Sequence, residues 1–198
     1  MESSAQIVRT TLESFDQELS LLVNSWHTAF SDRIWILFSD KFIWIALYAI
    51  VLYFLFRRLG WKKALLAVAC LVLMIVCCDQ SANLVKNSAC RLRPCNDPWM
   101  LSHGIHLPHG AGGRYGFFSA HAANSFGFAV GSLKIFKTEK SHPYRRYGYS
   151  IMIWASLVSL SRVFLGRHYL GDILVGTIVG LAFGILWASV YKRVSLKL

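Results

Sequence analysis

Charged residues are scarce in this sequence, and acidic ones most of all. Asp, Glu, Lys and Arg make up 16% of the 198 residues, with 10 acids against 21 bases, whereas a soluble domain carries about 25% charge. This scarcity argues against a water-soluble enzyme. Disorder is excluded as well, because 55% of the residues are hydrophobic and can bury ample apolar surface. The mean hydropathy is +0.45, and the length fits one domain.

The sequence also lacks the cysteine pattern of a disulfide framework and the pattern of a cleavable signal peptide. Three of the five cysteines lie in an apolar run, where a thiol behaves as a small hydrophobic side chain. No Cys-x-x-Cys motif occurs, and only Cys90 and Cys95 flank a polar segment, so these two can bond if that segment faces an oxidising compartment. The first residues are acidic and precede no apolar run, so we expect no cleavable signal peptide.

Five apolar segments dominate what is present. They cover residues 42–56, 64–78, 117–133, 147–160 and 173–191. The last has 19 residues without charge, close to the roughly 20 that a membrane span needs. The first two have 15 residues each, and basic residues that flank them can snorkel and lengthen them. A large soluble helical core is the alternative, which the composition and the basic flanks weaken.

Basic residues between these segments predict the orientation. They gather after the first segment, after the third segment and in the C-terminal tail, accompanied by a single acid, Glu139. Two spans separate each group from the next, so all three lie on the cytoplasmic side by the positive-inside rule. Residues 79–116 and 161–172 then face outward. The basic residues of the three groups are Arg57, Arg58, Lys62, Lys63, Lys134, Lys137, Lys140, Arg145, Arg146, Lys192, Arg193 and Lys197.

Residues 1–40 differ from the rest, with six acids against two bases. Apolar residues recur at spacings of three and four from Leu12 to Trp26, which predicts an amphipathic helix. We expect residues 1–40 to form interfacial helices on the outer face, and residues 41–198 to form the membrane bundle. The alternative is a sixth span with the N-terminus inside. The predicted fold is therefore all-α, a polytopic bundle of five to six transmembrane helices with N-terminal interfacial amphipathic helices.

Polar residues in the outward regions form three groups. In the first, Arg93 follows Lys86 by seven residues, about two helical turns, so the two cations share a face if this stretch is helical. Pro94 then ends the segment. The second group, Ser119 and His121, stands at the outer end of the third apolar segment.

The third group lies between the last two apolar segments. Ser161 and Arg162 precede His168 and Asp172, whose spacing of four lets them meet on one helix face. Ionisable groups at membrane depth are costly and imply function. Three fixed cations suit a phosphate group, a histidine held by a carboxylate is an activated nucleophile or base, and a second histidine can protonate a leaving oxygen.

These motifs resemble the three-part signature of the type 2 phosphatidic acid phosphatase family, whose relatives include lipid A phosphatases and vanadium haloperoxidases. The resemblance covers residues 42–191. It implies a membrane lipid phosphatase that needs no metal or other cofactor. The motifs are Lys86-x6-Arg93-Pro94, Ser119-x-His121 and Ser161-Arg162-x5-His168-x3-Asp172.

The resemblance also implies a role for each residue. His168 would be the nucleophile that forms a phosphohistidine, Asp172 would orient it, and His121 would be the general acid. The family's second motif usually reads Pro-Ser-Gly-His, whereas alanine stands here before His121. Alanine keeps the N–H group but adopts a positive φ poorly, which puts the loop geometry in question. The phosphate-binding positions would be Lys86, Arg93, Ser119, Ala120 and Arg162.

Four substrates fit this reading: phosphatidic acid, phosphatidylglycerophosphate, undecaprenyl diphosphate and lipid A phosphates. The expected location is a bacterial inner membrane, crossed several times, with the active site facing the periplasm. The expected partners are the bilayer and its lipid phosphate; nucleic acid is excluded because most basic residues flank the membrane or the phosphate pocket. A non-catalytic lipid-binding or lipid-transport protein on the same scaffold is the alternative, which the intact motifs disfavour. A second alternative is a haloperoxidase that binds vanadate in the same pocket, but those relatives are larger and soluble.

Two further patterns carry predictions. His103, His106 and His109 form a regular run, but glycine and proline around them favour an irregular loop. A role near the substrate headgroup, together with Arg114, is preferred there to a metal site.

Small residues also recur at spacings of four in the third and fifth apolar segments, which lets membrane helices approach closely. We predict that these two stripes pack against each other and hold the two histidines at working distance. The stripes are Ala123, Gly127 and Gly131, and Gly176, Gly180, Gly184 and Ala188.

Overall fold

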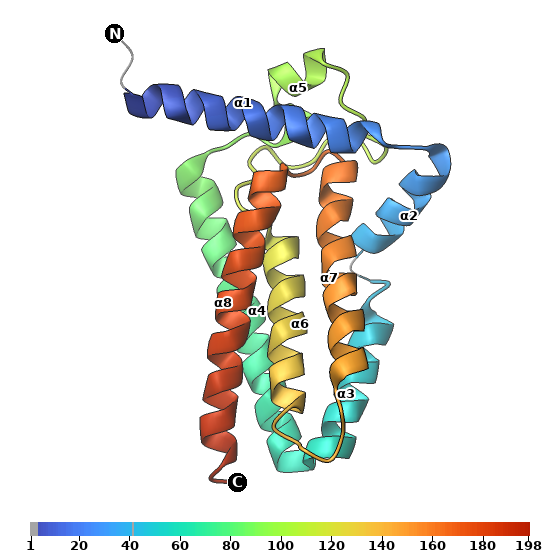
Figure 1. The fold of residues 1–198 in the computed structure, drawn as a ribbon, viewed down its shortest axis with the longest axis vertical. Coiled ribbons are helices and arrows are strands. Elements are labelled where there is room, and N and C mark those ends of the chain that lie inside the picture. Colours follow the sequence, from blue (N-terminus) through green and yellow to red (C-terminus); the bar gives the residue numbers. More distant parts are fainter. Residues whose placement is uncertain (1–3, 41) are drawn as a thin grey trace.

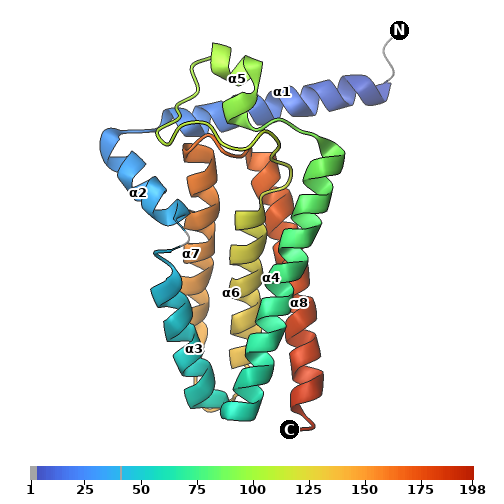
Figure 2. The ribbon, with the colours of Figure 1, turned by 180° about the vertical axis from the view of Figure 1, so that it is seen from behind.

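The computed structural model describes residues 4–40 and 42–198, and throughout these residues the regular structure is helical. This confirms the all-helical class that the apolar segments predict. Five long helices run side by side, and two N-terminal helices accompany them (Figures 1 and 2). The elements are α1 (Ser4–Ser25), α2 (Ala29–Ser39), α3 (Ile45–Leu59), α4 (Trp61–Ala89), the 3₁₀-helix η1 (Pro94–Asn96), α5 (Pro98–Ser102), α6 (Ala120–Phe136), α7 (Arg145–Phe164) and α8 (Leu170–Ser195).

Two of the described helices, α4 and α8, are long and apolar enough to cross a membrane. Helix α4 reaches Ala89, so the first part of the expected outer connection is helical. Asp79 explains this difference, because its carboxylate accepts a 2.8 Å hydrogen bond from Asn124 on α6. A polar residue with a partner inside the bundle does not end a helix. The end comes at Cys90, whose φ of 48° is left-handed and typical of a helix terminus.

The predicted contact between the two small-residue stripes is confirmed. A Cβ atom built on Gly180 would lie 2.2 Å from the carbonyl oxygen of Ala123, and one built on Gly184 would lie 2.5 Å from that of Gly127. The backbones of α6 and α8 therefore touch, and only glycine at these positions permits it. Helix α6 lies among α4, α7 and α8, and the N-terminal ends of α6 and α8 both point toward the end of the bundle that α1 covers (Figure 1).

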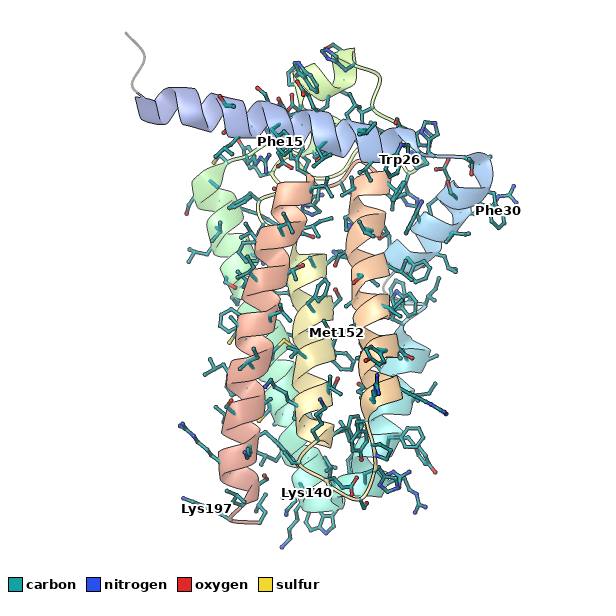
Figure 3. All side chains as sticks on the ribbon, viewed as in Figure 1. Phe15, Trp26, Phe30, Lys140, Met152 and Lys197 are labelled. Atoms are coloured by element: carbon teal, nitrogen blue, oxygen red, sulfur yellow. The ribbon has the colours of Figure 1, made fainter. Side chains whose placement is uncertain are left out.

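Helix α1 lies across the end of the bundle at which α7 ends and α8 begins (Figure 1). Its polar side packs against the protein: Asn24 donates hydrogen bonds to the carbonyls of Val163 and Phe164, and Ser20 accepts one from the N–H of Leu170. Its apolar side is exposed and faces away from the rest of the protein. The exposed apolar side chains are Leu12, Phe15, Leu19, Leu22 and Trp26. Lys140 and Lys197 lie at the opposite end of the bundle from α1 (Figure 3).

The pairing considered for Cys90 and Cys95 is not formed. Both thiols are free, with Cys90 exposed and Cys95 buried. The sulfur of Cys90 lies 3.2 Å from the carbonyl of Asn87, whereas the sulfur of Cys95 accepts from the N–H of Gly112. The end of α4 and the loop after it thus turn the two thiols toward different neighbours.

Candidate active site

The turn between α7 and α8 positions the last histidine of the motifs. The N–H groups of Arg167 and His168 both donate to the carbonyl of Arg162, at 2.8 and 3.1 Å. Gly166 provides the left-handed conformation that the turn requires, with φ of 62°. These bonds fix the backbone of His168 two residues before α8 begins.

His168 and Asp172 meet as predicted, with 3.1 Å between Nδ1 and Oδ2. The expected shared helix face is wrong, because His168 precedes α8 and only Asp172 lies within it. The carboxylate caps the helix instead: Oδ2 also accepts from the N–H of Tyr169 at 3.1 Å. Both side chains are buried, 2% and 0% exposed. An acceptor at Nδ1 keeps a proton there, so Nε2 is the basic nitrogen.

Burial lowers the pKa of His168 to about 4, although the hydrogen bond and charge of Asp172 oppose this shift. The charges of Arg162 and Arg93 lower it further. The ring is consequently neutral at neutral pH, and Nε2 keeps the lone pair that a nucleophile needs.

Arg93 lies in an extended segment beside residues 112–116, and its Nε donates to the carbonyl of Tyr115 at 3.0 Å. A Cβ on Gly116 would meet Arg93 Cγ at 2.8 Å and His168 Nδ1 at 3.4 Å, so this glycine lies between the side chains of Arg93 and His168. The condition for Lys86 and Arg93 to share a helix face is not met, because α4 ends at Ala89. Pro94 does not end the segment but starts η1.

The remaining cations approach from the last turns of α4 and α7. Lys86, Arg93, Arg162 and His168 all act electrostatically on the ring of His121, the second residue of α6. Arg162 donates one hydrogen bond to Ser39, and its Nε is buried with no partner in the described part of the chain. The three motifs therefore converge on one region with a donor left for an incoming acceptor.

The second motif begins α6. Ser119 is the N-cap: its hydroxyl accepts from the N–H of Ala122, and its own N–H donates to the carbonyl of Asp172 at 3.0 Å. Ala120 is the first helical residue, and Cys90 alone among the described non-glycine residues has a positive φ. Alanine thus fits where the family usually has glycine, and the free N–H groups of this terminus favour an anion.

Sequence reasoning missed two residues of this region, Arg91 and Asp16. Arg91 donates to Asp172 Oδ1 and to Asp16 Oδ2, each at 2.7 Å. One signal existed for Arg91, since residues two apart in an extended segment point to the same side and Arg93 was already a candidate. Nothing in the sequence distinguishes Asp16 from other acids of the first 40 residues.

The histidine run does not converge. His106 lies 2.9 Å from a carboxylate oxygen of Asp32 and stacks on His27, while the ring of His103 stacks on Trp99. Among residues 4–40 and 42–198, no three His, Cys, Asp or Glu side chains are grouped to hold a metal ion. The expected role of the run and of Arg114 near a headgroup stays a prediction.

A buried neutral histidine held by a carboxylate, with a second histidine and three cations in reach, equips an enzyme for phosphoryl transfer. Comparison with protein families agrees. The model of the PAP2 superfamily matches residues 63–195, and the chain belongs to this superfamily. The expected enzyme class, a phosphatase, is confirmed.

Two curated relatives match most of the chain. The lipid A 4'-phosphatase of Bacteroides thetaiotaomicron is 34% identical over 189 residues, which cover 94% of this chain and 81% of that protein. The lipid A 4'-phosphatase of Porphyromonas gingivalis is 30% identical over 177 residues, which cover 89% and 72%.

Two solved structures share the fold. A transmembrane PAP2-type phosphatidylglycerolphosphate phosphatase from Bacillus subtilis superimposes with a TM-score of 0.71 at 18% identity, covering 92% of this chain and 87% of that one. Aquifex aeolicus LpxE gives a TM-score of 0.62 at 20% identity, covering 87% and 93%. The bundle described above is thus a known membrane phosphatase fold.

Proposed function

We propose that this PAP2 phosphatase hydrolyses a phosphate of lipid A at the outer face of a bacterial inner membrane. The observation that carries the substrate is the 34% identity to a lipid A 4'-phosphatase over 94% of the chain. Among the four lipids that the motifs allow, this match favours lipid A. The likeness to a phosphatidylglycerolphosphate phosphatase rests on 18% identity and concerns the fold.

The same proposal includes five spans, α3, α4, α6, α7 and α8. Helices α3 and α6 have 15 and 17 residues, and the basic residues near their inner ends can snorkel to the interface. Helix α2 has 11 residues, about 16 Å, too short to cross. Helix α1 lies across the bundle end and exposes its apolar side, which suits an interfacial helix at the outer leaflet.

In the first chemical step, Nε2 of His168 attacks phosphorus. The bond from phosphorus to the lipid oxygen breaks, and the electron pair leaves with that oxygen, which takes a proton from His121. The negative charge of the bound phosphate favours a proton on His121 beforehand. Asp172 accepts the hydrogen bond from Nδ1 and stabilises the positive charge that develops on the phosphohistidine.

In the second step, water attacks the phosphorus of the phosphohistidine while His121 takes a proton from the water. The bond between nitrogen and phosphorus breaks, the electron pair returns to Nε2 and inorganic phosphate leaves. Lys86, Arg93 and Arg162 bind the phosphoryl oxygens through both steps, and the hydroxyl of Ser119 and the N–H of Ala120 add hydrogen bonds. No step calls for a metal ion.

Phosphate release by the purified chain from the four lipids tests this function, with His168→Ala as the background. Lipid A should be hydrolysed with the highest kcat/KM, and the variant should release no phosphate above blank. Preference for another of the four lipids would contradict the substrate, and equal release by His168→Ala would contradict the mechanism.

A further inference from the structure

Arg91 connects Asp172, the partner of His168, to the N-terminal helix α1. Its two terminal nitrogens reach different carboxylates: one donates to Asp172 Oδ1 and the other to Asp16 Oδ2, each at 2.7 Å. Asp172 is fully buried, whereas Arg91 and Asp16 keep 23% and 16% exposure. Together with His168 on Oδ2, Arg91 leaves neither carboxylate oxygen of Asp172 without a partner.

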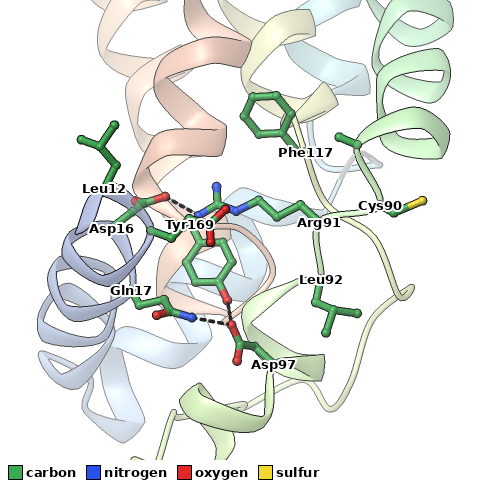
Figure 4. A pocket seen from close by; sticks show the side chains of 11 residues that line it. Leu12, Asp16, Gln17, Cys90, Arg91, Leu92, Asp97, Phe117 and Tyr169 are labelled. Carbon is green, nitrogen blue, oxygen red and sulfur yellow. Dashed lines mark hydrogen bonds and ion pairs between the residues drawn. The ribbon is translucent and has the colours of Figure 1, made fainter. Parts of the chain in front are cut away.

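Asp16 is itself held in place, so it is a fixed anchor for Arg91. Its carboxylate accepts from the N–H of Gly171 at 2.9 Å and from the hydroxyl of Ser20. The guanidinium carbon of Arg91 also lies 4.2 Å from the ring centre of Tyr169, within the range of a cation–π contact. Figure 4 shows Arg91 between Asp16 and Tyr169.

A second set of hydrogen bonds connects α1 to the turn that precedes α8. The hydroxyl of Tyr169 and the amide of Gln17 both donate to Asp97, the residue that caps α5. Tyr169 follows His168 in the chain, so two sets of hydrogen bonds connect α1 to this turn, one through Asp16 and one through Gln17. Tyr169, Gln17 and Asp97 line a cavity of about 520 Å³ that Leu12 and Phe117 also border (Figure 4).

We propose that Arg91 and Asp16 are positioning residues that hold Asp172, and through it the ring of His168, for attack on phosphorus. Neither residue belongs to the three motifs, and neither reaches the phosphate in this role. A buried carboxylate with every oxygen in a fixed hydrogen bond has one orientation, and the orientation of Asp172 sets that of the ring. Helix α1 is thereby a structural part of the active site.

Arg91 also has an electrostatic effect that a purely mechanical support would lack. The charged and titratable groups that act on His168 are Asp172, Arg162, Arg93 and His121. Arg91 offsets the negative charge of Asp172. Without it, Asp172 stabilises the imidazolium more strongly, the pKa of His168 rises, and the neutral nucleophile is lost at a higher pH.

The test compares Arg91→Gln, Arg91→Lys, Asp16→Asn and the double variant Asp16→Asn/Arg91→Gln. Arg33→Gln and Glu18→Gln are matched controls, because these exposed residues of α2 and α1 lie outside the site. The proposal rests on the proposed phosphatase chemistry but not on the lipid. Rates are therefore measured with p-nitrophenyl phosphate, and vanadate binding reports whether the phosphate pocket is intact.

Arg91→Gln should lose about 100-fold in kcat, the cost of a misplacement of about 1 Å, with KM and vanadate affinity near the wild-type values. Its acidic limb should move up by about one pH unit, whereas Arg91→Lys should keep the limb and recover part of kcat. Asp16→Asn should lower kcat without moving the limb. Because Asp16 acts through Arg91, the double variant should lose no more than Arg91→Gln alone.

Arg91→Gln with wild-type kcat and an unmoved acidic limb would overturn the proposal. So would a loss of kcat that comes with an equal loss of vanadate binding, because the whole site would then have collapsed. Additive losses in the double variant would separate Asp16 from Arg91 and also contradict it. Failure of the proposed substrate is a different result: the wild-type chain would then hydrolyse p-nitrophenyl phosphate but not lipid A.

Discussion

Gly180→Ala adds one methyl group where α6 and α8 touch, about two helical turns below Asp172. The new Cβ would lie 2.2 Å from the carbonyl oxygen of Ala123 and 2.9 Å from its carbonyl carbon and Cα, whereas ordinary contact begins at 3.4 Å. All three atoms belong to the backbone, so no side chain can rotate away. The helices must separate by about 1 Å, at an overpacking cost of roughly 1–3 kcal/mol.

The two helices carry His121 and Asp172 in their first turns, so this separation should reach the active site. A misplacement of about 1 Å costs about 100-fold in rate, and we expect that loss in kcat for phosphate release. Gly148→Ala is the matched control, because the three atoms nearest its Cβ, at 3.1 Å or more, all belong to the Leu133 side chain. If Gly180→Ala keeps the kcat and Tm of Gly148→Ala, the close helix contact does not position the site.

Three further predictions follow from the site. His121→Ala should keep the first step with p-nitrophenyl phosphate, whose leaving group needs no proton, and so release a burst of p-nitrophenol, but should lose several orders of magnitude in that step on a lipid phosphate; equal losses in the first step on both substrates would contradict a general acid. Burial lowers the pKa of His168 to about 4, so the neutral nucleophile persists below pH 6. In a pH profile, kcat/KM should therefore stay near its maximum just below pH 6, and a fall to half of the maximum near pH 6.5 would contradict this prediction. Single cysteines at Gly110 and Thr138 should differ on intact cells, with the impermeant thiol reagent labelling the first alone; the reverse would invert the topology.

The apolar segments predicted the five long helices well, because burial and helix formation both follow from a local pattern. The end of α4 was missed because the pairing of Asp79 with Asn124 joins two helices, and no local pattern shows it. The amphipathic pattern of α1 predicted a helix, but not that its polar side would face the protein. That side carries Asn24, whose amide satisfies carbonyls more than a hundred residues away.

Motif spacing likewise predicted the contact between His168 and Asp172, since residues four apart are neighbours in any helical turn. It could not predict how the pair meets, because Asp172 caps α8 and His168 lies before it. Arg91 lies 81 residues from Asp172 and 75 from Asp16. Contacts at such separations depend on how the helices assemble, so only the folded structure shows that Arg91 contacts Asp172 and Asp16.

Trapping of the phosphorylated enzyme tests the central claim, nucleophilic attack by His168, most directly. In His121→Ala the first step proceeds with p-nitrophenyl phosphate, but hydrolysis lacks its base, so the intermediate should accumulate. After an alkaline quench, which preserves phosphohistidine, peptide mass spectrometry should find one phosphate on His168. Phosphate on another residue, or a burst of p-nitrophenol with no phosphate on the protein, would contradict the mechanism.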